Sequence, residues 1–315
     1  IGWCDWSSDV CSSDLMAGVA AMQAGQVKEV TLASRDELGT LAAAFNRMAH
    51  LIEDREAKLK QALSEIWGEM NLAHRIQTAL VPAAPVLPGF DVACHMTTAT
   101  EVGGDYYDVI STAEGHWVVI GDVSGHGVTA GLVMMMARTA IRTAIESAQS
   151  TQGATPTPAA VLAVTNRTLV ESIQKLGLDK YMTISLLQHR ENGHFLHAGL
   201  HLDLLVLRRD GRSVERYETT GCWLGIDAQA GEWLENHTLQ LDPGDILVLY
   251  TDGVTEAMKN GELFGERRLE NVLLEAASRG GPQEIRQSIL AAIADWEKPD
   301  DVTVVVLRRQ PADYS

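Results

Sequence analysis

A proline-rich segment, VPAAPVLPG at residues 81–89, divides this sequence into two parts with different hydrophobic patterns. Proline lacks a backbone N–H and biases the residue before it away from helical angles, so a helix that enters this segment must end near Val81. Upstream of the prolines, apolar residues recur at spacings of three and four, whereas short apolar runs and helix-like stretches are mixed downstream. The sequence therefore predicts a long helix followed by a separate domain of mixed secondary structure.

The apolar stripe upstream of the prolines begins behind a capping box formed by Ser34 and Glu37. Its members are Leu38, Leu41, Phe45, Met48, Ile52 and Leu59, followed less regularly by Ala62, Ile66, Met70, Ala73, Ile76 and Leu80. Alternating spacings of three and four are typical of a coiled-coil seam, which a parallel homodimer would bury. The alternative is a single amphipathic helix that lies on the downstream domain.

Downstream of the prolines, strands and helices are predicted in clusters. Strand-like runs fall at 91–96, 116–123, 181–188, 201–208, 245–252 and 301–308. Helix-like stretches fall at 129–147, 157–174, 265–277 and 282–295. Because the two kinds of element do not strictly alternate, the pattern predicts an α+β fold in which antiparallel sheets are covered by helices.

Charge and cysteine usage exclude several classes of protein. The formal net charge of −17 opposes binding to DNA, RNA or anionic lipid, because those partners are bound through clustered Lys and Arg, and we expect no nucleic-acid partner. The four cysteines include no C-x-x-C pair, which argues against a disulfide framework or a zinc site. No uninterrupted apolar run approaches the roughly 20 residues that span a bilayer, so the chain as written is expected to be soluble.

The first fifteen residues, IGWCDWSSDVCSSDL, differ in character from the rest of the sequence. They show no helical or strand period and resemble read-through of sequencing-adapter DNA. We therefore expect residues 1–15 to be non-native, and any membrane anchor to lie in an upstream segment that is missing from this chain.

Four acidic clusters stand at the edges of predicted strands: EVGGDYYD at 101–108, GDVSGHG at 121–127, YTDGVTEA at 250–257 and KPDDVTVVV at 298–306. Each cluster places an aspartate where an apolar run begins or ends. If these carboxylates converge, their mutual repulsion would be relieved by divalent cations, and hard oxygen ligands favour magnesium or manganese. Any one cluster could instead be an ordinary turn, but four in one domain favour metal ligation.

The wording and order of these clusters resemble the PPM family of metal-dependent protein phosphatases (protein phosphatase 2C-like), specifically its SpoIIE and RsbU subgroup. The resemblance covers about residues 89–309 and is carried by VGGDYYD, GDVSGHG, PGDILVLYTDGVTEAMKNGELFGERRL and DDVTVVVL. It implies an α-β-β-α sandwich of two antiparallel sheets, with a site for two Mn²⁺ or Mg²⁺ ions at one end. It also implies an enzyme of bacterial signal transduction that hydrolyses phosphoserine or phosphothreonine in another protein with metal-activated water.

The resemblance assigns metal-ligand positions to residues that all lie at predicted strand ends: Asp105, Asp122, Val123, Asp252, Asp300 and Asp301. Asp122 is expected to bridge both ions, assisted by the main-chain carbonyl of Val123. Asp252 and Asp300 complete the catalytic set with Asp122, while Asp105, within VGGDYYD, supports the site from nearby. Of the neighbouring aspartates Asp300 and Asp301, Asp301 is the less favoured ligand.

Some details of the family pattern do not transfer to this sequence. His126 could act as a general acid or could be an ordinary loop residue between glycines. Where family members often read A-G-H-x-P, this chain reads AGLHLD at 198–203, so His201 is displaced by one position. Arg138 and Arg142 follow the second acidic cluster on a predicted helix, where we expect solvated helix charges instead of a phosphate clamp.

Two upstream segments resemble parts of bacterial sensor proteins. DELGTLAAAFNRMA at 36–49 resembles the second helix of a HAMP domain, and AHRIQTALVP at 73–82 resembles the linker helix of the phosphatase subgroup. The resemblance implies a homodimer on the cytoplasmic side of the inner membrane, with His74 exposed or at the dimer seam. The predicted divisions are non-native sequence at 1–15, a partial HAMP domain at 16–58, a linker or coiled-coil helix at 59–88, the phosphatase domain at 89–309 and a tail at 310–315.

The subgroup resemblance implies a phosphorylated STAS-domain anti-anti-sigma factor as the protein substrate and partner. The alternatives are a catalytically silent phosphatase fold that serves as a binding module, a HAMP-linked histidine kinase and a HAMP-linked diguanylate cyclase. A kinase would need an Asn-rich box and a glycine-rich ATP lid, which residues 90–309 lack. A cyclase would need an acidic residue at the position of Tyr106 in GGDYY.

Overall fold

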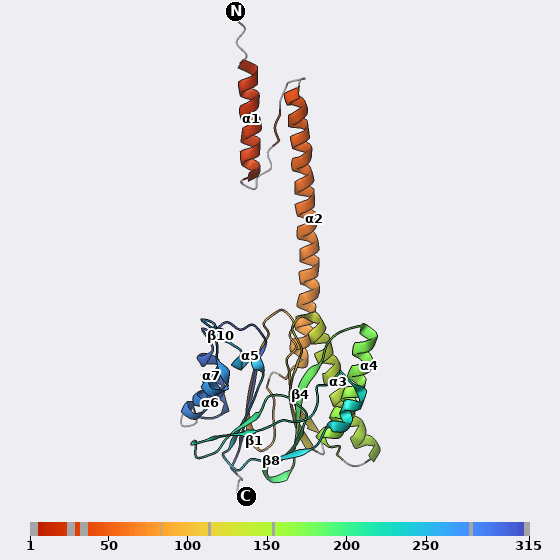
Figure 1. Ribbon diagram of the computed structural model, residues 1–315, viewed down its shortest axis with the longest axis vertical. Helices are drawn as coiled ribbons and strands as arrows, with labels where there is room; N and C mark the ends of the chain where they lie inside the picture. The colour runs from red at the N-terminus through yellow and green to blue at the C-terminus, as the bar shows by residue number, and fades with distance from the viewer. Residues whose placement is uncertain are drawn as a thin grey trace, which may run out of the picture. The chain divides into compact units, whose positions relative to one another are not determined.

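The computed structural model describes residues 6–23, 29–31, 37–82, 84–112, 115–152, 155–276 and 280–311 (Figure 1). Ser34 of the expected capping box and most of the expected C-terminal tail lie outside the described residues. The chain divides into two compact units, Ile1–Glu69 and Met70–Ser315, and each is described here by itself.

The N-terminal unit contains α1 (Trp6–Gln23) and most of α2 (Glu37–Leu80). Val30 lies between them, buried with Phe45, and its backbone N–H and C=O both bond the side-chain amide of Asn46 at 3.0 and 2.9 Å. Helix α1 extends over residues 6–15, although the sequence shows no helical period there. Once a helix is started, each added residue gains a hydrogen bond, so a segment without an apolar stripe can extend a helix that is anchored elsewhere.

Helix α2 leaves much of its apolar stripe exposed. The exposed large side chains on it are Leu41, Met48, Leu51, Ile52, Leu59, Leu63, Ile66, Trp67, Leu72 and Ile76. A row of exposed apolar side chains on one helix is unfavourable in water unless another surface covers it. The stripe that the sequence predicts is therefore present as an uncovered surface of the single chain.

The C-terminal unit is built on two five-stranded antiparallel sheets. The first has the order β1 (Phe90–Thr97), β12 (Val302–Arg309), β9 (Ile246–Tyr250), β6 (Leu204–Leu207) and β7 (Val214–Tyr217). The second has the order β2 (Tyr106–Thr112), β3 (Gly115–Val123), β4 (Met182–His189), β5 (His194–Ala198) and β8 (His237–Gln240). A core that includes Val118, Leu187 and Val305 joins the inner faces of the two sheets.

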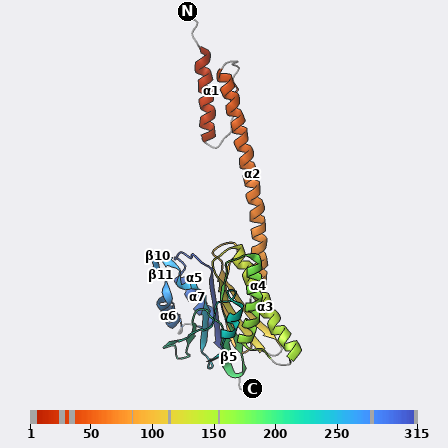
Figure 2. The ribbon, with the colours of Figure 1, turned by 45° about the vertical axis from the view of Figure 1, so that its right-hand side comes forward.

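Helices cover the outer face of each sheet, as Figures 1 and 2 show. Helices α3 (Val128–Gln152) and α4 (Pro158–Leu176) pack on the second sheet, and α6 (Gly265–Ala276) and α7 (Pro282–Ala292) pack on the first. The short helix α5 (Asp252–Thr255) follows β9, and a small hairpin, β10 (Met258–Lys259) and β11 (Glu262–Leu263), precedes α6. The predicted α-β-β-α sandwich is confirmed.

The predicted elements match the observed ones closely, except at the start of β6 and at several short elements that were not predicted, among them α5 and the hairpin β10–β11. Strand β6 begins at Leu204, three residues later than predicted, because residues 199–203 form the crossing from one sheet to the other. Strands β2, β5, β7 and β8 were not predicted. The last three are four or five residues long and carry polar side chains, so they lack the apolar run that identifies a strand.

Helix α3 is long and apolar enough, by length and composition alone, to cross a membrane, over Val128–Ala148. The sequence analysis found no such segment because charged residues interrupt it. Val133, Ala137 and Ile141 of α3 are fully buried against the second sheet, as in the core helix of a folded domain. We therefore interpret α3 as a core helix.

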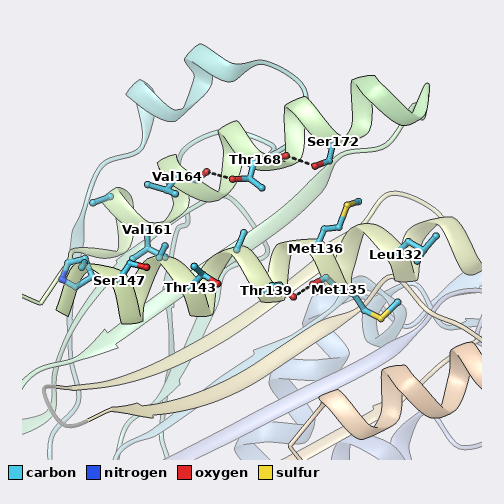
Figure 3. Close-up of a pocket in the computed structure, with 15 residues that line it drawn as sticks. Leu132, Met135, Met136, Thr139, Thr143, Ser147, Val161, Val164, Thr168 and Ser172 are labelled. Carbon is cyan, nitrogen blue, oxygen red and sulfur yellow. Dashed lines mark hydrogen bonds between the residues drawn. The ribbon is translucent and has the colours of Figure 1, made fainter. Parts of the chain in front are cut away.

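A groove of about 900 Å³ lies between α3 and α4 (Figure 3). Its lining is apolar or hydroxylated, with Leu132, Met135 and Met136 from α3 and Val164 and Thr168 from α4. Of the residues that the structure describes, no acidic side chain lines this groove, so it is not the predicted cation site.

Candidate metal centre

The predicted acidic clusters gather at one end of the two sheets. Asp105 precedes β2 and Asp122 lies near the end of β3, and these two strands are neighbours in the second sheet. Asp252 follows β9, and Asp300 and Asp301 precede β12, its neighbour in the first sheet. Because neighbouring strands are antiparallel, the end of one and the start of the next meet at the same edge. Both sheets therefore contribute aspartates to one place.

The pKa of the Asp122 carboxyl shows how closely these groups interact. Burial raises this pKa to about 9, and repulsion from the aspartates at 105, 252, 300 and 301 adds to the effect. Burial also raises the pKa of Asp252 to about 6, with repulsion from Glu256 and Asp300 next in size. Like charges that are buried together disfavour ionisation unless a cation is present. The cluster is therefore electrostatically poised to bind positive charge.

Asp105 is fully buried and links the two sheets. Its Oδ2 accepts hydrogen bonds from the hydroxyls of Thr251, at 2.8 Å, and Thr303, at 2.5 Å. Its Oδ1 is buried without a hydrogen-bond partner among the described residues, and the same is true of Oδ1 of Asp252. Buried acceptors are nearly always partnered, so two open carboxylate oxygens in one cluster fit the donor set of a hard cation.

Asp301 has a different environment from Asp300. Its Oδ1 accepts the backbone N–H of Ala99 at 2.7 Å, and its Oδ2 accepts the N–H groups of Gly104 at 2.7 Å and Asp105 at 3.3 Å. Both oxygens thus hold the loop at 99–105 against the start of β12. This use of its oxygens favours Asp300 over Asp301 as a cation ligand.

Two glycines allow this loop to pass close to the acidic cluster. A Cβ on Gly103 would lie 2.1 Å from Oδ2 of Asp301, and a Cβ on Gly104 would lie 2.6 Å from the carbonyl oxygen of Val123. The same Cβ on Gly104 would be 3.1 Å from Oδ1 of Asp122. Any larger residue would push the loop away, so the glycines are required for close backbone approach.

The side chains do not form a compact chelate. Among the residues that the structure describes, no three His, Cys, Asp or Glu side chains lie close enough together to hold one ion. Magnesium-type sites commonly use one or two carboxylates and several waters, so this arrangement still fits such an ion. Ligation by the predicted residues stays a prediction.

Two residues of α2 contact the same loop, and the sequence analysis did not assign them this role. Gln77 is buried, and its side-chain amide donates to the carbonyl of Gly103 at 2.9 Å and accepts from the N–H of Gly103 at 3.1 Å. One turn earlier, Nδ1 of His74 donates to the carbonyl of Glu101 at 2.7 Å. His74 is thus half-buried against this loop and not fully exposed, while its expected place at a dimer seam stays a prediction. Their i, i+3 spacing on one helix face was the available signal.

The sequence predicts that Arg138 and Arg142 are solvated helix charges, and this prediction is wrong, because both side chains face a buried carboxylate. Arg142 forms two hydrogen bonds of 2.9 Å with the carboxylate of Asp108, and Nε of Arg138 lies 3.7 Å from it. Asp108 is fully buried on β2 and also accepts from the hydroxyl of Tyr106 at 3.2 Å. A buried carboxylate needs a cation, and α3 supplies two. These arginines therefore neutralise an internal charge.

The two other histidines considered in the sequence lie in different settings. His126 is exposed in the loop before α3, and no contact of the described residues assigns it a role. His201 lies in the crossing between the sheets, and both of its ring nitrogens are hydrogen-bonded.

Comparison with known protein families gives two matches. Residues 112–310, more than half of the chain, match the family model described as Stage II sporulation protein E (SpoIIE). Residues 13–54 match the HAMP domain model. The first cluster, VGGDYYD, lies just before the SpoIIE match.

Three individual proteins are similar to this chain. The phosphoserine phosphatase RsbU of Bacillus subtilis (strain 168) is 28% identical over 261 residues, which cover 80% of this chain and 73% of RsbU. The SiaA-PP2C domain of Pseudomonas aeruginosa is 26% identical, with a TM-score of 0.66 over 78% of this chain and 98% of that domain. The RsbU and RsbW domains of Rv1364c from Mycobacterium tuberculosis are 26% identical, with a TM-score of 0.59 over 72% of this chain and 61% of that one.

Proposed function

The chain belongs to the SpoIIE family of protein phosphatase 2C-like serine/threonine phosphatases and carries an N-terminal HAMP domain, and we propose that it dephosphorylates a partner protein with two Mn²⁺ or Mg²⁺ ions. The fold and the family leave a catalytically silent phosphatase fold as the remaining alternative.

One observation carries the proposed metal dependence. Asp122 is coupled to carboxylates from both sheets, and its pKa is raised to about 9 by burial and by their repulsion. Near pH 7 such a cluster can be fully ionised only if cations neutralise it. When bound, two divalent ions would supply an activated water and would neutralise the phosphoryl oxygens of the substrate.

The proposed roles of the residues follow from their positions. Asp122 is electrostatically coupled to the aspartates at 105, 252, 300 and 301 and would contact both ions, with the carbonyl of Val123 assisting. Asp252 and Asp300 would ligate from the first sheet. Asp105 would offer its open Oδ1. In this assignment Asp301 is not a ligand, because its oxygens hold the loop that carries Asp105.

We propose a phosphorylated STAS-domain anti-anti-sigma factor as the substrate, within a partner-switching pathway. The support is the similarity to the phosphoserine phosphatase RsbU and to a chain that contains RsbU and RsbW domains. These similarities support signalling by protein–protein interaction more directly than they support any one substrate.

The domain organisation is also a proposal. We retain a partial HAMP domain at 16–58, a linker at 59–88 and a phosphatase domain at 89–309, with a homodimer formed through α2 and a membrane tether upstream. The exposed apolar stripe of α2 and the HAMP match support this arrangement. Gln77 and His74 give the linker direct contact with the loop that precedes Asp105.

The test is turnover of para-nitrophenyl phosphate and of a phosphoserine peptide by the full chain, with Mn²⁺ or with EDTA. We expect Mn²⁺-dependent turnover that falls roughly a hundredfold or more in Asp122→Asn and Asp252→Asn, because each removes a charged ligand. Asp210→Asn, an exposed aspartate in the turn between β6 and β7, is the control and should keep full activity. Absence of turnover in the wild type, with retained binding of the phosphopeptide, would support the silent binding module.

A further inference from the structure

His201 lies where the chain crosses from the second sheet to the first, between β5 and β6. Its backbone N–H donates to Oγ1 of Thr219 at 3.0 Å, and that hydroxyl donates in turn to the carbonyl of His201. The backbone at this crossing is therefore fixed, and the imidazole has a defined direction.

The imidazole of His201 bonds one strand of each sheet. Its Nε2 donates to the carbonyl of Tyr250, the last residue of β9, at 3.1 Å. Its Nδ1 accepts from the hydroxyl of Thr183 on β4, at 2.9 Å. A carbonyl can only accept, so Nε2 carries a proton, and the ring is neutral when Nδ1 accepts from Thr183. Burial agrees with this, because it lowers the pKa of His201 to about 4.

Both partners of this ring are adjacent to proposed cation ligands. Thr183 is the register partner of Asp122 across β3 and β4, and its hydroxyl lies 3.4 Å from the carbonyl oxygen of Asp122. Tyr250 is two residues before Asp252. The ring thus joins the strand end beside Asp122 in one sheet to the strand end before Asp252 in the other.

We propose that His201 is a positioning residue that sets the separation between Asp122 and Asp252 and so the affinity of the centre for divalent cations. The inference rests on the proposed function, because it assumes that these two aspartates are ligands. Two ions held between separate sheets need a fixed separation of their ligands, and groups behind the ligands commonly change metal affinity about 10- to 100-fold. A merely structural histidine would stabilise the fold without changing that affinity.

The experiment compares three variants of the full chain: His201→Ala, His201→Gln and, as a matched control, His197→Gln. His197 is also a buried histidine with its pKa lowered to about 4, and it lies on β5, facing His237. Gln at position 201 can still donate to the carbonyl of Tyr250, so it should restore part of the link.

The first readout is Mn²⁺ affinity, measured from the electron paramagnetic resonance signal of free Mn²⁺, beside urea denaturation in EDTA. We expect His201→Ala to weaken Mn²⁺ binding about tenfold, His201→Gln to weaken it less, and His197→Gln to leave it unchanged. The second readout is hydrogen exchange in EDTA at 121–124 and 250–255, which should become faster in His201→Ala, should become faster to a smaller degree in His201→Gln, and should stay unchanged in His197→Gln.

Equal Mn²⁺ affinity in the wild type and His201→Ala, or an equal loss in His197→Gln, would overturn the inference. If His201→Ala does not fold, His201→Gln decides in its place, since unchanged affinity and unchanged exchange there overturn the inference as well. Absence of Mn²⁺ binding by the wild type would instead overturn the proposed function, and would be distinguished by the first titration.

Discussion

Two groups of buried carboxylates in this phosphatase domain have opposite charge environments. Asp108 is neutralised within the chain by Arg142 and Arg138. Asp122 lies on β3, the partner strand of β2, and its pKa is raised to about 9 by burial and by repulsion from other aspartates. The chain therefore supplies cations where a buried charge serves the fold, and supplies none where the charge can serve chemistry.

The largest expected effect on stability is that of Asp108→Asn, which removes the carboxylate that the two arginines neutralise. This change leaves two partly buried guanidinium groups without their carboxylate, so we expect a loss of about 3 kcal/mol in the free energy of unfolding. Urea denaturation measures it, with Asp210→Asn as the exposed control. A loss of unfolding free energy below about 0.5 kcal/mol would mean that water solvates both guanidinium groups well enough to replace Asp108.

A second prediction concerns the loop at 99–105, which precedes β2 and is bonded to Asp301. Gln77→Ala removes both bonds to the backbone of Gly103, which should cost about 2 kcal/mol because a buried N–H and C=O lose their partner. Hydrogen exchange should become faster across 99–105. Thr78→Ala is the neighbouring control, since that hydroxyl bonds the carbonyl of His74 within the helix. Unchanged exchange would show that the bonds from Asp301 and His74 fix the loop without Gln77.

The third prediction has the opposite sign from the first. In EDTA above about pH 9, where Asp122 is ionised, Asp122→Asn should raise the free energy of unfolding by about 1 kcal/mol because it removes one of several repelling charges. Near pH 7, where this carboxyl is mostly protonated, the same change should leave the free energy of unfolding unchanged. The same urea measurement checks it. A clear loss of stability would show that the cluster already contains compensating contacts.

The fourth prediction concerns the pH dependence of stability. The folded-state pKa values of Asp122, about 9, and Asp252, about 6, lie above the ordinary value of 3.8, so the folded protein binds more protons than the unfolded one. In EDTA, this contribution to stability is therefore full below about pH 4 and is lost as the pH rises towards 9. The urea concentration at the unfolding midpoint should decrease as the pH rises from 5 to 9, and saturating Mn²⁺ should make that decrease smaller. A midpoint that rises over this range would contradict the raised values.

The layered fold was predictable because its main elements carry local signals. Apolar runs identified β3, β9 and β12, and the proline segment marked the end of α2. Short polar strands such as β7 and β8 gave no such signal, because each is stabilised by pairing with a neighbouring strand more than by an apolar run of its own. For β8 that neighbour, β5, is distant in the sequence.

The acidic end of the sandwich could be located from the sequence, but its connections could not. Aspartates at strand ends are visible as motifs, whereas the pairing of Arg142 with Asp108 spans 34 residues and depends on how α3 lies on the sheet. The hydrogen bond from the N–H of Gly104 to Asp301 spans 197 residues. Such partners are set by tertiary packing, which no local pattern encodes.

The open carboxylate oxygens also have a consequence for the protein in a cell. A cation that binds the folded chain but not the unfolded one adds to stability in proportion to the logarithm of its free concentration. Proteases act on the fraction that is unfolded, so a more stable chain persists longer. We therefore expect the cellular level of this phosphatase to fall when divalent metal is scarce, which would make metal supply a control on its abundance as well as on its activity.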